Sequence, residues 1–290
     1  MRIKCYLKEM RIHHYIKNLL IFVPLACSGK LFYIDKLIML LFAFISFCFM
    51  SSAVYCINDI CDREMDKQHP SKLARPIVNG DITVKSACIF TVILIMLSLV
   101  FNLFCFNIYS FILLLSYLLI NIGYSFGLKN IPLIDISILA AGFIIRILYG
   151  SVISDIQISN WLYLVVISVA FYLGFGKRRN ELIRQEGSNT RKVIKKYPLS
   201  FLDSSMNMCM ALIFVFYALW TVDEKTISVY RNTYLIWTLP LVMLIFFKYS
   251  LRVEGNSDGD PVEVLLHDKI LVALCALYLI IMFVLLYVFR

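Results

Sequence analysis

The chain has 290 residues, of which 61% are hydrophobic and only 16% are charged, and its mean hydropathy is +0.81. Soluble domains are typically about half apolar and a quarter charged, so this composition excludes a soluble protein and indicates one integral membrane domain over residues 1–290. The net charge is +9, but the basic residues cluster in short loops between apolar runs. That distribution is typical of membrane topology and of anionic lipid headgroups, so we expect a lipid bilayer and no nucleic acid as partner.

Apolar runs predict an all-α fold, a polytopic membrane bundle of about nine helices. The runs lie near residues 19–28, 37–57, 86–104, 109–124, 131–149, 161–175, 201–221, 234–247 and 270–289. The first run is short and contains Pro24, so we expect an irregular or kinked helix there. No internal repeat or long linker suggests a second domain.

The loop charges predict the orientation of the chain. With nine spans, the loops on the N-terminal side carry 22 of the 28 Lys and Arg residues and the other side carries 5, with Arg146 inside a span. The positive-inside rule then places the N-terminal side in the cytoplasm. We therefore predict a multi-pass protein of the cell membrane whose active-site mouth faces the cytoplasm.

The stretch from residue 58 to residue 76 follows the second apolar run and reads N-D-I-C-D-R-E-M-D-K-Q-H-P-S-K-L-A-R-P. Asp59, Asp62 and Asp66 are spaced by three and four residues, which places all three carboxylates on one helix face, with Asn58 at its edge. Carboxylate and amide oxygens are the ligands that Mg²⁺ takes from proteins. The alternative is a solvated loop whose charges only keep it out of the bilayer.

Basic residues follow these acids closely. Lys72 and Arg75 lie within ten residues of Asp66, and their side chains suit phosphate better than metal. We therefore predict a site for a Mg²⁺-bound diphosphate at the membrane surface, with catalytic roles for Asp59 and Asp62 as well as Asp66.

A second polar island, Y-S-F-G-L-K-N-I-P-L-I-D, spans residues 124–135. Tyr124 and Lys129 are candidates for phosphate binding at a helix boundary, although Tyr and Lys also serve as ordinary interfacial anchors. Asp135 and Arg146 lie within one apolar run and are separated by eleven residues, or about three helical turns. They should therefore face the same way but lie about 16 Å apart, too far for direct pairing. Ionisable residues inside spans generally face a cavity or a partner, and Asp135 could serve only to orient a neighbour.

Two further segments contribute candidate substrate-binding residues. Residues 174–182 read G-F-G-K-R-R-N-E-L, and in this segment Lys177, Arg178 and Glu181 share one helix face. The position of Lys177 and Arg178 at a span end after two glycines favours an anionic substrate. The lead-in R-I-H-H-Y-I-K-N places Lys17 and Asn18 at the membrane boundary.

Taken together, these motifs resemble the UbiA superfamily of intramembrane prenyltransferases. The resemblance is carried by N-D-x-x-D-x-x-x-D followed by P-x-K-x-x-R-P, and it covers about residues 11–268. The Y-I-K-N lead-in, the Y-S-x-x-L-K segment, the D-x(10)-R pair, the G-K-R-x-x-E segment and a D-P-x-E turn are similar to the decaprenyl-phosphate phosphoribosyltransferase branch. Aromatic prenyltransferases of the superfamily carry a second D-x-x-x-D pair where this chain has Lys177, Arg178 and Glu181.

The resemblance implies a Mg²⁺-dependent transfer of 5-phosphoribose from phosphoribosyl diphosphate to a polyprenyl phosphate, with release of diphosphate, as a step toward cell-wall precursors. It also implies a UbiA-like bundle around a central cavity, with Mg²⁺ on Asn58 and the three aspartates and substrate phosphates on the basic residues. Two alternatives stay open: an aromatic prenyltransferase that uses a polyprenyl diphosphate, and a lipid-phosphate transporter or flippase. The sequence also leaves open whether the chain forms a homo-oligomer.

Overall fold

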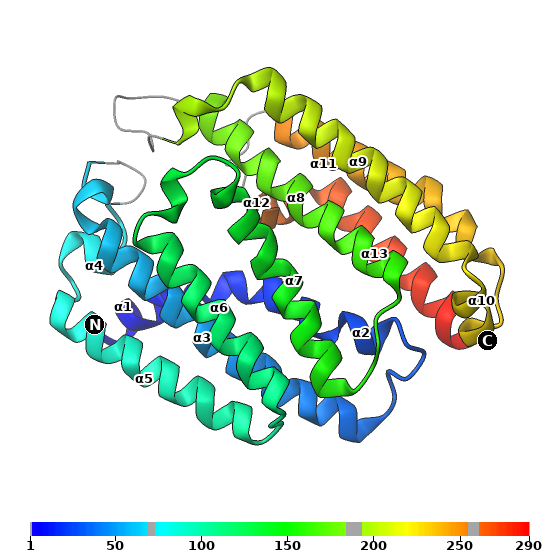
Figure 1. The fold of residues 1–290 in the computed structure, drawn as a ribbon, viewed down its shortest axis with the longest axis horizontal. Helices are drawn as coiled ribbons and strands as arrows, with labels where there is room; N and C mark the ends of the chain where they lie inside the picture. Colours follow the sequence, from blue (N-terminus) through cyan, green and yellow to red (C-terminus); the bar gives the residue numbers. More distant parts are fainter. Residues whose placement is uncertain (1, 69–72, 184–192, 255–260, 290) are drawn as a thin grey trace.

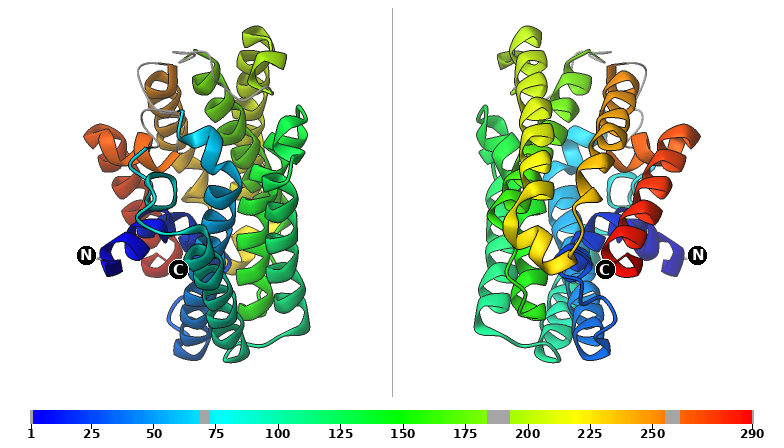
Figure 2. Two further views of the ribbon diagram at one scale, coloured as in Figure 1. Left: turned by 90° about the vertical axis from the view of Figure 1, so that its left-hand side faces the viewer. Right: turned by 90° about the vertical axis from the view of Figure 1, so that its right-hand side faces the viewer.

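The computed structural model describes residues 2–68, 73–183, 193–254 and 261–289, and these residues form helices and no strands (Figure 1). Within them, eight helical segments are long and apolar enough to cross a membrane. The eight are α3 (Ile34–Asp66), α5 (Val84–Leu103), α6 (Ile108–Ser125), α7 (Ile134–Ser154), α8 (Asn160–Ile183), α9 (Leu199–Val222), η5 with α11 (Tyr234–Glu254) and α13 with η6 (Lys269–Val288). Long helices pack side by side (Figure 2), which confirms the predicted all-α polytopic bundle.

The predicted span near residues 19–28 is not a membrane-spanning α-helix, so the count of about nine spanning helices is corrected to eight for the described residues. The chain forms the 3₁₀-helix η1 (Ile12–Phe22) and the short helix α2 (Val23–Ala26) instead. A 3₁₀-helix rises about 2.0 Å per residue, so the eleven residues of η1 extend about 22 Å. Residues 12–22 thereby extend from Arg11, which contacts Asp59, to Ile21, which lies beside Gly150 near the other end of α7.

The bundle has two ends, which are called here the aspartate end, where α3 finishes with Asp59, Asp62 and Asp66, and the far end, where α7 finishes at Ser154. Helix α1 (Arg2–Glu9) lies at the aspartate end, and its Lys8 donates to the carbonyl oxygen of Ala74 at 2.7 Å. The C-terminal η6 lies at the far end, where the hydroxyl of Tyr287 donates to the carbonyl oxygen of Ala26 at 2.7 Å. The N- and C-terminal helices thus lie at opposite ends (Figure 1).

Short helices and side-chain caps fix the ends of the long helices. The short elements are α4 (Pro76–Asn79), η3 (Leu128–Asn130), η4 (Ile194–Lys196), α10 (Glu224–Tyr230) and α12 (Pro261–His267). Asn107 and Ser110 form a capping box at the start of α6, and Asp268 accepts two backbone N–H bonds at the start of α13. These caps satisfy backbone groups that would otherwise be unpaired at the membrane boundary.

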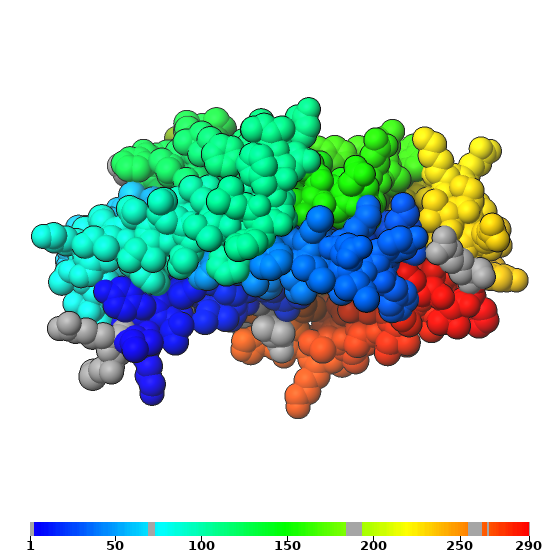
Figure 3. Space-filling view, turned by 90° about the horizontal axis from the view of Figure 1, so that it is seen from below, coloured from blue at the N-terminus to red at the C-terminus, as the bar shows by residue number. Residues whose placement is uncertain are grey.

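Apolar side chains form the interior and also cover the outer surface. One buried cluster joins η1, α3, α6 and α7 around Phe47 and Tyr149, and another joins α8, α9 and α11 around Tyr172 and Val253. Large hydrophobic residues such as Leu279 on α13 are exposed, as expected for helices that face lipid tails. Seen from below, the N-terminal segments (blue) lie between α5 and α6 (cyan to green) and the C-terminal helices (orange to red) (Figure 3).

Gly150 allows η1 to approach α7 closely. A Cβ atom at this position would lie 1.9 Å from the carbonyl oxygen of Ile21, so only glycine fits here without a backbone shift. We expect Gly150→Ala to destabilise the protein by about 3 kcal/mol, because the obstructing atom belongs to the backbone. Thermal unfolding in detergent measures the change. Gly176→Ala is the matched control, since its nearest neighbour is the flexible end of Met206 at 3.4 Å, and an equal loss in the two variants would contradict the prediction.

Candidate active site

The three aspartates of α3 are buried at the helix end where negative charge is least favourable. Asp59, Asp62 and Asp66 are between 1% and 4% exposed and lie in the last two turns of α3. The helix dipole disfavours carboxylates at a C-terminus, and burial of an unpaired charge is costly. Their location therefore requires cations from other segments.

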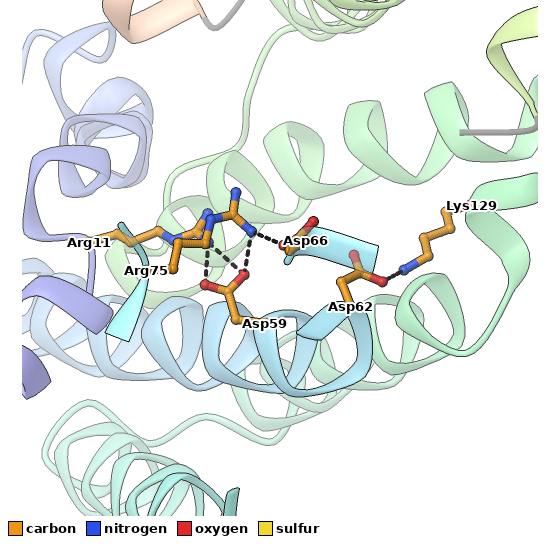
Figure 4. A network of polar contacts seen from close by, with 6 residues as sticks. All are labelled: Arg11, Asp59, Asp62, Asp66, Arg75 and Lys129. Carbon is orange, nitrogen blue, oxygen red and sulfur yellow. Dashed lines mark hydrogen bonds and ion pairs between the residues drawn. The ribbon is translucent and has the colours of Figure 1, made fainter. Parts of the chain in front are cut away.

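Two arginines donate hydrogen bonds to Asp59 (Figure 4). Arg11 donates to both of its oxygens, at 2.6 Å for Oδ1, and Arg75 donates to Oδ1 at 2.9 Å. Arg75 also donates to Oδ2 of Asp66 at 2.5 Å, so this guanidinium bridges two carboxylates. Lys129 forms a buried ion pair with Asp62. The cations thus come from three separate segments and converge on one helix face.

Local backbone conformation positions these cations. Arg11 caps η1 with φ of 52°, a left-handed conformation that is uncommon for a residue other than glycine and that directs its side chain to α3. Arg75 is extended, as expected for the residue before a proline, and lies directly before Pro76 at the start of α4. Lys129 follows Gly127, whose φ of 139° only glycine adopts readily.

The donor set suits a hard cation, but the described side chains do not gather around a single point. No group of three His, Cys, Asp or Glu residues in the described ranges is arranged to hold a metal ion. The acids instead hold Arg11, Arg75 and Lys129. The amide oxygen Oδ1 of Asn58, the residue before Asp59, is buried and accepts no hydrogen bond, so one oxygen of the predicted ligand set is uncommitted.

Glu9, at the end of α1, is a further buried acid of this site. It is 2% exposed, and neither of its carboxylate oxygens receives a hydrogen bond. Burial, followed by the nearby charge of Asp59, raises the pKa of Glu9 from its ordinary value to about 8. The side chain is therefore largely protonated at neutral pH.

The raised pKa of Glu9 predicts a pH-dependent stability in metal-free buffer. Ionisation is harder in the folded than in the unfolded protein, so the free energy of unfolding should fall as pH rises from about 4.5 toward 8. Glu9→Gln should remove that part of the slope, because glutamine does not ionise. Thermal unfolding with EDTA at a series of pH values measures it. Glu64→Gln, at a mostly exposed acid of α3, is the control, and identical slopes for wild type and Glu9→Gln would contradict the prediction.

A second cluster surrounds Arg178 of α8, which is fully buried. Its Nε donates to the buried carboxylate of Asp135, one terminal nitrogen donates to Glu181 at 2.5 Å and the other donates to the hydroxyl of Tyr124 at 3.1 Å. Asp135 thus orients a neighbour, which was one of the roles considered for it from sequence. Because all three edges of the guanidinium are engaged, Arg178 holds α6, α7 and α8 together.

Tyr197, after η4, completes this cluster. Its hydroxyl donates to Asp135 at 2.6 Å and accepts a bond from the backbone N–H of Leu133 at 2.5 Å. Burial and the bond to Asp135 raise the pKa of Tyr197 above its ordinary range, so the hydroxyl keeps its proton. Leu133 has φ of 67°, an uncommon conformation for leucine that directs its N–H to this hydroxyl.

Residues 124–135 connect the two clusters. Lys129 in this segment pairs with Asp62, whereas Tyr124 and Asp135 on either side of it contact Arg178. The polar segments at residues 124–135 and 174–182 therefore lie at the same end of the bundle as the aspartates.

Arg146 lies deeper in the bundle, three turns along α7 from Asp135. It donates to Asn18 at 2.7 Å, to the carbonyl oxygen of Gly142 at 2.6 Å and to the hydroxyl of Tyr117 at 3.2 Å. Its guanidinium carbon also lies 4.9 Å from the ring centre of Phe47. Asp135 and Arg146 thus have separate partners, in agreement with their predicted distance. Every described hydrogen bond of Arg146 goes to an uncharged group.

Three more of the predicted residues are lysines. Lys17 on η1 and Lys177 on α8 are half-buried, and Lys72 lies outside the described residues. Sequence analysis did not select Arg11, Glu9 or Tyr197 as site residues. Arg11 stands at the start of the lead-in that supplied Lys17 and Asn18, which is the one signal that could have identified it.

Comparison with known proteins decides the family. The profile of the UbiA prenyltransferase family matches residues 22–267. The chain belongs to this family. As a member of the UbiA prenyltransferase family with eight candidate spans, it is a multi-pass membrane transferase. The resemblance stated from sequence is confirmed.

Relatives within the UbiA family agree with this assignment. The chain is 32% identical to decaprenyl-phosphate phosphoribosyltransferase of Corynebacterium glutamicum, over 91% of this chain and 81% of that protein. It is also 32% identical to the enzyme of the same name from Mycolicibacterium smegmatis, over 91% of this chain and 87% of that protein. The fold is similar to that of a UbiA homologue from Archaeoglobus fulgidus bound to GPP and Mg²⁺, with a TM-score of 0.70 and 18% identity over 97% and 99% of the two chains.

Proposed function

We propose that this protein transfers 5-phosphoribose from phosphoribosyl diphosphate to a polyprenyl phosphate and releases diphosphate. The observation that supports this proposal is the cluster of ion pairs at the aspartate end, in which buried carboxylates of one helix pair with cations from three other segments. Such a cluster can exchange partners with a metal diphosphate, because phosphate oxygens can take over the cations and the metal can take over the carboxylates. The names of the relatives that match most of the chain support the choice of substrates.

In this proposal, Asn58, Asp59, Asp62 and Asp66 hold Mg²⁺, and the uncommitted amide oxygen of Asn58 supports this assignment. When bound, Mg²⁺ neutralises charge on the diphosphate leaving group. Arg11, Arg75 and Lys129 move from the carboxylates to the phosphate oxygens of the donor, for which Lys72, outside the described residues, stays a candidate from sequence. The bond between ribose C1 and the diphosphate oxygen breaks, and a phosphate oxygen of the lipid forms the new bond to C1.

A phosphate monoester is anionic near neutral pH, so the lipid phosphate needs no general base. Lys177, which lies at the end of α8 beside the buried Arg178, is our candidate for the acceptor phosphate or the 5-phosphate of ribose. Lys17 and Asn18 on η1 are further candidates for binding these phosphates. Arg146 is a buried cation that donates a hydrogen bond to Asn18. Arg178 and Glu181 serve the site by orienting Tyr124 and Asp135.

An assay in detergent tests the proposal. It combines radiolabelled phosphoribosyl diphosphate, Mg²⁺ and a polyprenyl phosphate, and it measures label in the lipid phase. A parallel reaction with a prenyl diphosphate and an aromatic acceptor tests the aromatic prenyltransferase alternative, and binding of polyprenyl phosphate without turnover would favour a transporter. A lipid phase without label in the first reaction would overturn the proposed function.

We also propose that the aspartate end faces the cytoplasm. Cys61, between Asp59 and Asp62 on α3, is exposed and is a natural probe of this end. An impermeant maleimide should label Cys61 in inside-out vesicles but not in right-side-out vesicles of the cell membrane, as read by peptide mass spectrometry. The reverse pattern would contradict the orientation, and labelling after detergent addition is the positive control.

A further inference from the structure

The far end of the bundle contains a cavity of about 470 Å³. Three segments form it: residues 24–30 after η1, residues 155–162 between α7 and α8, and residues 220–230 at the end of α9 and in α10. Its volume lies within the range of about 300–1,000 Å³ that is usual for small-molecule sites. Because the segments belong to the far end, the cavity is separate from the aspartates.

Contacts between the three segments preform this cavity. The hydroxyl of Tyr230 donates to the carbonyl oxygen of Cys27, and the indole N–H of Trp161 donates to Asp223 at 3.2 Å. Trp220 and Tyr230 line the cavity although each is no more than 3% exposed, so they form a fixed wall. Such a site can bind without a large ordering cost.

The cavity lies at the depth of lipid headgroups. Its residues begin directly after α7 ends at Ser154 and include Asn160, where α8 begins. Helix α9 ends beside it at Val222. The ends of spanning helices meet the headgroup layer, where tryptophan and tyrosine are enriched. An occupant of this cavity is therefore in contact with the leaflet at the far end.

Two lysines line the cavity, although the far end of the protein has few cations. The described cations of the far end are Lys30, Lys36, Lys225 and Arg231. Lys36 donates to the carbonyl oxygen of Ser154 at 2.5 Å. Lys30 and Lys225 line the cavity from two different segments, and within the described residues neither side chain has an acidic partner.

Two acids, Asp155 and Asp223, line the cavity together with these lysines. Asp223 uses one oxygen for Trp161 and the other for the backbone N–H of Thr226, where it caps α10. Asp155 directly follows the last residue of α7 and forms part of the cavity wall. Its φ of 49° is an uncommon conformation for a residue other than glycine. The formal charges of the two lysines and the two aspartates balance, but both oxygens of Asp223 already accept hydrogen bonds, so the groups that remain available to a ligand are two ammonium groups and the carboxylate of Asp155.

From these observations we propose that the cavity binds the phosphate group of an anionic lipid from the leaflet opposite to the candidate active site. The two lysines contact the phosphodiester and the buried aromatic wall packs against the glycerol end of the headgroup. Lysine side chains in pockets between membrane helices contact the phosphates of lipid headgroups in this way. The inference does not depend on the reaction at the aspartate end.

Native mass spectrometry of the purified protein with phosphatidylglycerol or phosphatidylcholine of equal chain length tests this site. We expect preferential retention of phosphatidylglycerol, and about thirty-fold weaker retention in Lys30→Ala/Lys225→Ala. Lys195→Ala/Lys196→Ala is the matched control, because it removes the same charge from exposed positions at the aspartate end. Unchanged thermal unfolding shows that the variants are folded, and turnover should be unchanged in the cavity variant.

Tryptophan fluorescence gives a second measurement. The chain has three tryptophans, of which Trp161 and Trp220 line the cavity, so Trp237→Phe leaves only the two cavity reporters. Their emission should change with phosphatidylglycerol and not with inorganic phosphate. Equal retention of the two lipids, equal retention in the Lys30→Ala/Lys225→Ala variant, or displacement of lipid by inorganic phosphate would each overturn the proposal.

Discussion

Asp62→Asn should lower phosphoribosyl transfer by about a hundred- to a thousandfold. Asp62 is buried and holds Lys129 as its ion-pair partner, so the substitution removes a proposed metal ligand and also releases the lysine that we assign to the donor diphosphate. The assay is initial-rate transfer of radiolabel into polyprenyl phosphate at saturating Mg²⁺.

Glu64→Gln is the matched control for Asp62→Asn. Glu64 lies two residues further along α3, is mostly exposed and pairs with Lys67 at the surface, so we expect a rate within about twofold of wild type. Binding of Mn²⁺ in the presence of phosphoribosyl diphosphate separates two explanations. Loss of Mn²⁺ binding together with turnover supports metal ligation by Asp62, whereas full turnover in Asp62→Asn would contradict the proposed site.

Arg178→Met should destabilise the protein by about 3–5 kcal/mol, because it leaves the carboxylate of Asp135 buried without its cation. Glu181 and Tyr124 lose a donor in the same substitution. We expect the midpoint of thermal unfolding to fall by about 10 °C. Thermal unfolding of the detergent-solubilised protein measures the loss.

A double variant separates the charge from the packing of Arg178. Asp135→Asn combined with Arg178→Met removes the buried charge together with its partner, so it should be more stable than Arg178→Met alone. Arg179→Met is the matched control, since Arg179 pairs with the exposed Asp203. A double variant less stable than Arg178→Met would show that Asp135 carries no uncompensated charge in the single variant.

The spans and the acidic helix face were predictable because both depend on local periodicity. Runs of apolar residues located all eight spanning segments, and the spacing of Asp59, Asp62 and Asp66 placed them on one face of α3. Hydrophobic length and helical period are properties of neighbouring residues, so a sequence expresses them directly.

The partners of these residues were not predictable by the same means. Arg11 lies 48 residues from Asp59, and Lys129 lies 67 residues from Asp62, so no spacing rule joins them. Spacing placed Arg178 on a helix face but could not decide whether that face met a ligand or a neighbouring helix. The sequence placed a span at residues 19–28, whereas the structure has the 3₁₀-helix η1 over residues 12–22, because a 3₁₀-helix extends further per residue and its polar residues do not show in an apolar run.

The segment from Tyr124 to Asp135 has a consequence for how the two substrates influence each other. Its middle pairs with the acids of α3 through Lys129, and its two ends contact Arg178. A donor that draws Lys129 away from Asp62 therefore alters the surroundings of the neighbouring Lys177. The free energies of binding of donor and lipid acceptor should then be coupled, and by thermodynamic reciprocity each should change the affinity of the other by the same factor.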